Sequence, residues 1–100
     1  MPGRRAPEPI AVEFVFTRAD LQPVVAAIRA AIGGDPVPLD SPHRVQNAVA
    51  TLIRMRRGRG DVVVSRSPAA LLTPEYWQVR LTGLDVPTHR MLAQIFRVGR

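Results

Sequence analysis

The order in which hydrophobic spacing changes along this chain most constrains its fold. Apolar side chains at every second position predict a strand with one buried face, and apolar side chains at every third or fourth position predict an amphipathic helix. The strand pattern occupies residues 10–17 and 75–82, and the helical pattern occupies residues 20–32, 41–57 and the stretch from 85 onward. The unbroken valine run in residues 61–66 predicts a further, buried strand. The expected order is therefore strand, helix, helix, strand, strand, helix.

Residues with known capping preferences support these boundaries. Asp20 is expected to cap the first helix, and the glycine pair at 33–34 to end it. Ser41 gives the clearest helix start, because a serine N-cap is followed by proline at the first helical position. The second helix is expected to end near Gly58, and Gly83 is expected to close the last strand.

Three strands and three helices within 100 residues predict one α+β domain. We expect a two-layer sandwich, with the helices on one face of a three-stranded, mostly antiparallel sheet. The domain should span residues 10–100, and residues 1–9, with three prolines and two arginines, should form a disordered tail. The side chains expected to face the helices are Val12, Phe14, Phe16, Trp77, Val79 and Leu81. The opposite face should be uncovered.

Over residues 10–98 this element order resembles the type I K-homology fold of domains that bind RNA and single-stranded DNA. The best fit is Val79–Gly83, followed by a helix with the pattern of Met91–Ile95. That family clamps the nucleic-acid backbone with a Gly-x-x-Gly loop between its first two helices. Here the connecting segment 33–40 is acidic and proline-rich. The resemblance therefore implies a fold and transfers no binding residue.

A winged helix shares part of the order and is the alternative fold. Its reading helix would correspond to residues 41–57. The long first strand and the long connection between the first two helices count against it.

The charge of the chain is carried by arginine alone. All 14 cationic residues are arginine, against 8 carboxylates, for a formal net charge of +6. Four fall within six residues where the second helix should end: Arg54, Arg56, Arg57 and Arg59. One or two cations would serve the dipole of a helix C-terminus. Since the planar guanidinium binds phosphate or carboxylate in two places, this cluster predicts contacts with nucleic acid or with an acidic protein.

A second candidate surface is the uncovered face of the sheet, where Tyr76 and Arg80 should lie on either side of Gln78. An aromatic ring beside a guanidinium can stack a single-stranded base and hold its phosphate. Tyrosine and arginine are also enriched at protein interfaces. The same face is therefore a candidate for homodimer formation.

Other functional classes have no residues to support them. The chain has no cysteine, and neither His43 nor His89 has the spacing of a metal ligand. We expect no catalysis, no metal and no cofactor. No apolar run approaches the roughly 20 residues that span a bilayer, and the first residues do not have the pattern of a signal peptide. We therefore expect a cytoplasmic protein with no membrane partner.

These observations favour a small, non-enzymatic nucleic-acid-binding domain. The alternative is a protein-interaction adaptor, or a homo-oligomeric regulatory subunit, with no role on nucleic acid.

Overall fold

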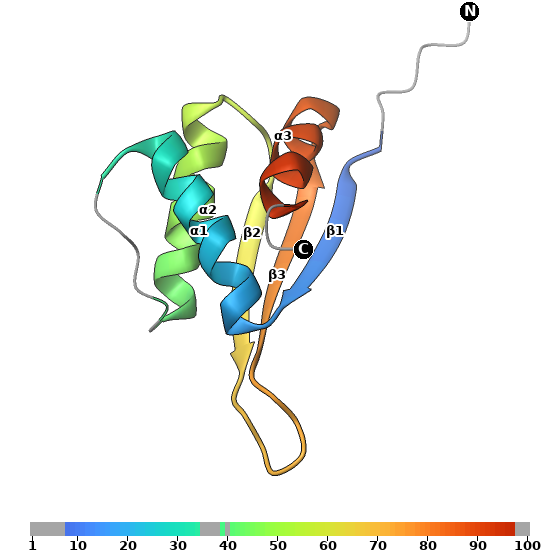
Figure 1. The fold of residues 1–100 in the computed structure, drawn as a ribbon. Helices are drawn as coiled ribbons and strands as arrows, with labels where there is room; N and C mark the ends of the chain where they lie inside the picture. The colour runs from blue at the N-terminus through green and yellow to red at the C-terminus, as the bar shows by residue number, and fades with distance from the viewer. Residues whose placement is uncertain (1–7, 35–38, 40, 98–100) are drawn as a thin grey trace, which may run out of the picture.

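A computed structural model describes residues 8–34, 39 and 41–97. Six elements follow one another: β1 (Ile10–Phe16), α1 (Arg18–Ile32), α2 (Pro42–Met55), β2 (Asp61–Ser67), β3 (Tyr76–Leu84) and α3 (Val86–Phe96). This is the order predicted from the sequence (Figure 1). The expected tail lies outside the described residues up to position 7, as does most of the connection between α1 and α2.

The sheet has the order β1-β3-β2, and both pairings are antiparallel. Strand β3 is therefore central, and β2 is an edge strand. The expectation of a buried strand at 61–66 holds only for Val62 and Val64, which are buried. Val63 is 57% exposed, because it points to the face of the sheet that carries no second layer.

The three helices lie over one face of the sheet, as expected (Figure 1). On β3 the alternation is strict: Trp77, Val79 and Leu81 are fully buried against the helices. The apolar stripes of α1 and α2 complete the core with Leu21, Val24, Val25, Ile28, Val45, Ala48, Val49 and Leu52. Burying each valine or leucine contributes about 1.5–3 kcal/mol, so these stripes fix the positions of both helices.

The predicted start of α1 and the predicted end of β3 are wrong. The N-cap of α1 is Thr17 and not Asp20, because the Thr17 hydroxyl accepts the N–H of Asp20 at 3.2 Å. Gly83 does not close the last strand. It lies inside β3 with φ +68°, where the register with β1 shifts, and the strand continues to the buried Leu84. This bulge brings the chain directly into α3.

Candidate nucleic-acid interface

The four clustered arginines surround the C-terminal end of α2. After the helix, the N–H of Gly58 donates to the carbonyl of Ile53 at 2.8 Å. The N–H of Arg57 donates to the carbonyl of Arg54 at 3.0 Å. These two bonds form a Schellman motif, which satisfies the last carbonyls of a helix. The main chain that carries Arg56 and Arg57 is therefore held by backbone hydrogen bonds.

Arg57 occupies the left-handed position of this motif, with φ +52°. Glycine is the usual residue there, because other residues lose roughly 1–2 kcal/mol in this conformation. The sequence predicted that the second helix continues to about residue 57 and ends near Gly58, whereas α2 ends at Met55 and Arg57 takes the left-handed position after it. Gly58 serves another purpose: a Cβ at this position would lie 2.4 Å from the hydroxyl of Thr88. Glycine allows the turn to pack closely on α3.

The turn is fastened to the first residues of α3. The N–H of Arg59 donates to the Thr88 hydroxyl at 3.2 Å, and the carbonyl of Arg59 accepts the N–H of Asp85 at 3.3 Å. Asp85 caps α3 by accepting the N–H of Thr88 at 3.1 Å. Hydrogen bonding from Thr88 is the main reason that the pKa of Asp85 lies below its usual value. The Arg59 side chain therefore extends from a residue whose main-chain N–H and carbonyl are both hydrogen-bonded.

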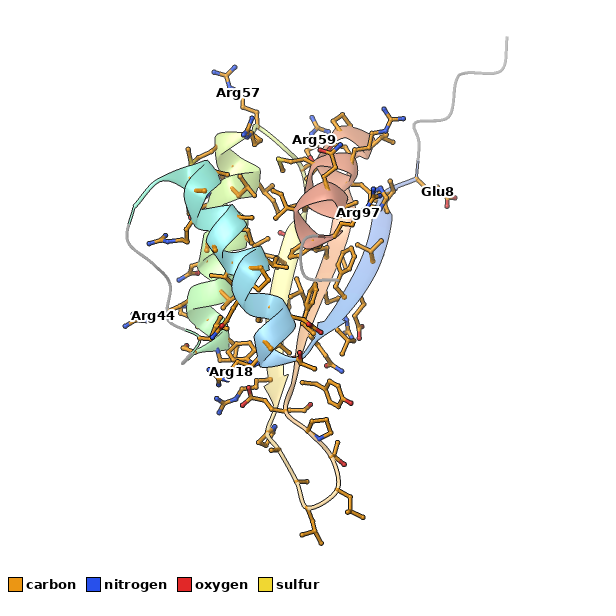
Figure 2. The ribbon with its side chains drawn as sticks, in the orientation of Figure 1. Glu8, Arg18, Arg44, Arg57, Arg59 and Arg97 are labelled. Carbon is orange, nitrogen blue, oxygen red and sulfur yellow. The ribbon has the colours of Figure 1, made fainter. Side chains whose placement is uncertain are left out.

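All four clustered side chains are exposed. The salt bridges among the described residues join Arg18, Arg66 and Arg80 to Glu75 or Glu13, and none involves the cluster. Arg57 and Arg59 extend from the same end of the molecule (Figure 2). A hollow of about 340 Å³ separates Arg56 and Arg57 from the first turn of α3. This end can attract a polyanion and donate several charge-assisted hydrogen bonds to it.

Arg80 and Tyr76 lie on the uncovered face of β3 but not beside the cluster. Arg80 pairs across the sheet with Val63 inside β2, whereas Arg59 precedes that strand by two residues. Its guanidinium contacts the Glu13 carboxylate on β1 at 3.2 Å. Tyr76 is half-buried, another four positions further along the sheet. The predicted site residues thus occupy two separate surfaces.

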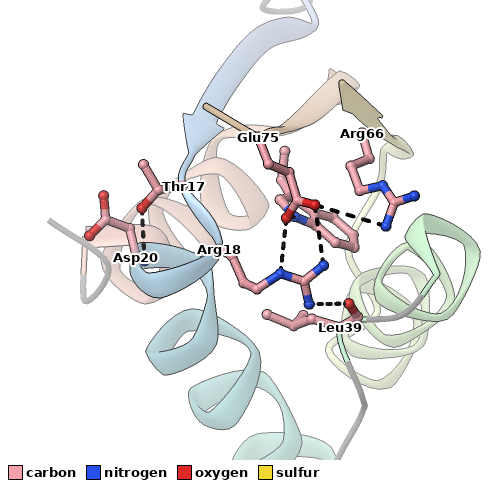
Figure 3. Close-up of polar contacts among 7 residues, drawn as sticks. Thr17, Arg18, Asp20, Leu39, Arg66 and Glu75 are labelled. Atoms are coloured by element: carbon pink, nitrogen blue, oxygen red, sulfur yellow. Dashed lines mark hydrogen bonds and ion pairs between the residues drawn. The ribbon is translucent and has the colours of Figure 1, made fainter. Parts of the chain in front are cut away.

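A polar group at the base of the β2–β3 hairpin was not predicted. Glu75 accepts hydrogen bonds from Arg18 Nε at 2.9 Å and from Trp77 Nε1 at 2.8 Å (Figure 3). The guanidinium carbons of Arg18 and Arg66 lie 5.6 Å and 5.9 Å from the centre of the Trp77 ring. The hydrogen bond from Arg18, followed by that from Trp77, lowers the pKa of Glu75. We call these four residues the hairpin base.

The sequence contained a signal for one member of the hairpin base. Arg66 is two and four positions from the buried Val64 and Val62, which places it on the same, helix-covered face of the sheet. Arg18 and Glu75 are 57 positions apart, and no local pattern joins them.

Comparison of the chain with protein-family models, with curated proteins and with solved structures finds no match. Within residues 8–34, 39 and 41–97, no helix combines the length and the apolar character needed to cross a bilayer. The same residues contain no group of three histidine, cysteine or acidic side chains arranged to hold a metal ion.

Proposed function

We propose that this chain is a small, non-enzymatic nucleic-acid-binding domain that contacts phosphates through Arg54, Arg56, Arg57 and Arg59. The observation that carries the proposal is the pairing of charges. Four exposed guanidinium groups gather at one end, and no salt bridge in the described part of the chain reaches them. Like charges gathered without a salt bridge repel one another, so their arrangement favours an external anion.

The backbone at Arg57 supports the same proposal. A glycine would satisfy its left-handed conformation at a lower free energy. A surface position that departs from the locally preferred residue is typical of a functional site, where the lost stability is offset by binding. The Arg57 side chain is also among the exposed members of the cluster.

The test is the salt dependence of binding to labelled oligonucleotides, measured by fluorescence anisotropy. If all four arginines neutralise duplex phosphates, they contribute roughly −3.6 to the slope of log K against log salt concentration. The double variant Arg57→Gln/Arg59→Gln should reduce the magnitude of this slope by roughly 1.8 on duplex DNA and by roughly 1.4 on a single strand.

The matched control is Arg44→Gln/Arg97→Gln, which removes the same charge from exposed positions. Arg44 lies near the start of α2, ten residues and about 15 Å from Arg54, and Arg97 follows the far end of α3 (Figure 2). The control should leave the slope close to that of the unmodified protein. If the slope falls equally in the two variants, the cluster contributes to binding only through the net charge of the protein. Failure to bind any duplex or single strand at low salt would refute the proposal.

A second candidate function, a homodimeric interaction module, is favoured by the uncovered sheet face. Val15 and Val63 are 48% and 57% exposed there, on the strands to either side of β3. Light scattering across a concentration series tests this candidate. Val63→Asp should dissociate a dimer formed through this face, whereas Val86→Asp at the start of α3 should not. A monomer at every concentration would exclude the homodimer.

A further inference from the structure

The connection between β2 and β3 carries two leucines at its tip. Leu71 is 98% exposed and Leu72 is 93% exposed, whereas the other leucines in the described part of the chain are buried. The connection extends beyond the body of the molecule, away from the ends of α2 and α3 that meet at the arginine cluster (Figure 1). Exposed apolar side chains that lie together indicate a contact with another apolar phase.

The tip is an ordered turn. The N–H of Ala70 donates to the carbonyl of Thr73 at 2.8 Å, and the N–H of Thr73 donates back to the carbonyl of Ala70 at 3.2 Å. The two leucines are the central residues of this turn. Hydrogen bonds across the turn also satisfy part of its main chain, which lowers the cost of moving it out of water.

Charge is distributed unevenly along the hairpin. Residues 67–74 contain no ionisable side chain. The first charges behind the tip belong to the hairpin base, where Arg18 and Arg66 face the single carboxylate of Glu75. An apolar tip is therefore followed by a base with a surplus of positive charge. The half-buried Tyr76 lies at the same level.

The shape of the tip distinguishes between the surfaces that would accept it. A stable protein interface buries about 800 Å² on each partner, far more than two side chains on a narrow turn provide. A bilayer accepts a convex apolar tip without a preformed groove, and its anionic head groups attract nearby arginines. The uncharged tip would lie in the apolar part of the bilayer, and the cationic base behind it would lie at the anionic head groups.

We propose that Leu71 and Leu72 insert into the interfacial layer of an anionic membrane, with Arg18 and Arg66 at the level of the lipid phosphates. The contact is weak and reversible, because two leucines bury fewer methylene groups than one myristoyl chain, which is itself a marginal anchor. The expectation of no membrane partner was based on the length of apolar runs. A hairpin tip that enters only the interfacial layer needs no spanning segment. The proposal does not depend on nucleic-acid binding, because it concerns other residues.

The first experiment locates the contact by fluorescence. The chain has one tryptophan, Trp77, and it is fully buried. Leu71→Trp adds a second indole at the tip, and Val63→Trp adds one on the open sheet face as a control. With phosphatidylcholine–phosphatidylserine vesicles, the tip indole should shift to the blue and be quenched by brominated lipid. The control indole should do neither. Binding without a shift at position 71 would overturn the proposal.

The second experiment separates the tip from the arginine cluster, which can itself attract anionic vesicles. Leu71→Ser/Leu72→Ser should weaken co-sedimentation with these vesicles by about 100-fold, since each buried leucine is worth about tenfold. Met55→Ser removes an exposed apolar side chain beside the cluster and should have little effect. An unchanged affinity in the double-serine variant would overturn the proposal. So would a smaller oligomer in that variant by light scattering, since the tip would then dock on a second copy.

Discussion

The two ends of this molecule use arginine in opposite ways. At the hairpin base, Arg18 and Arg66 share one carboxylate and stack on a buried tryptophan, so their charge serves the fold. At the end of α2, four arginines extend into solvent with no salt bridge in the described part of the chain. The number of charges does not distinguish these ends. Their pairing does: the cluster offers four guanidinium groups without a salt bridge to any described residue, whereas the hairpin base offers one positive charge in excess of its single carboxylate.

The two ends also differ in what holds them. The hairpin base is held by side-chain contacts, among them the one between Arg18 and Glu75, whereas the arginine cluster is carried by a turn that main-chain hydrogen bonds secure. Side chains of the cluster can therefore change with little effect on stability, but its backbone cannot. Three substitutions test this difference.

The largest effect is expected from Gly58→Ala. The added methyl group would lie 2.4 Å from the Thr88 hydroxyl, so the turn or the first residues of α3 must move. Overpacking of this kind lowers the free energy of unfolding by about 1–3 kcal/mol, which chemical denaturation measures. In a Thr88→Ala background the loss should be smaller, because the closest atom is gone. An unchanged denaturation midpoint would show that the turn is not held tightly.

Arg57→Gly should have a smaller effect of the opposite sign. Relief of the left-handed backbone should raise the free energy of unfolding by about 1 kcal/mol, while affinity for nucleic acid falls with the lost charge. Arg57→Gln is the matched control, because it removes the same charge and keeps the strain. If both variants are equally stable, the backbone at Arg57 carries no measurable strain.

The smallest effect is expected at the hairpin base, from Glu75→Gln. The pKa of Glu75 is lowered in the folded chain, chiefly by the hydrogen bond from Arg18. Its ionised form therefore stabilises the fold above the ordinary pKa of 4.5, and this contribution is lost as the pH falls through the folded value. The variant should be less stable than the unmodified protein at neutral pH and approach it in acid. A difference that stays constant with pH would exclude this role for the charge.

Most of the fold could be predicted from the sequence, because the burial of one face imposes a period that the sequence displays. The buried alternation of Trp77, Val79 and Leu81 and the apolar stripes of the helices follow this rule. The ends of the elements were harder to predict. Thr17 and Asp20 are both suitable N-cap residues, and only the three-dimensional structure shows that Thr17 caps α1. The location of the arginine cluster, at the end of the second helix, could be predicted from the sequence.

The state of each charge in the candidate site could not be predicted. Arg80 is separated from Glu13 by 67 positions, and Arg18 from Glu75 by 57. Which arginines are neutralised depends on the pairing of β1 and β3 and on the start of α1, and such long-range contacts leave no periodic mark on the sequence.

The place of β3 at the centre of the sheet has a consequence for the order of events during folding. Strand β1 is made first, yet its partner is β3, whose residues 76–84 are made only after α1, α2 and β2. On a ribosome that adds about 5–20 residues per second, β1 waits several seconds for its partner. The sheet therefore cannot form until nearly the whole domain has been synthesised, and the hairpin of β2 and β3 should then form before the β1–β3 pair because its contacts are more local.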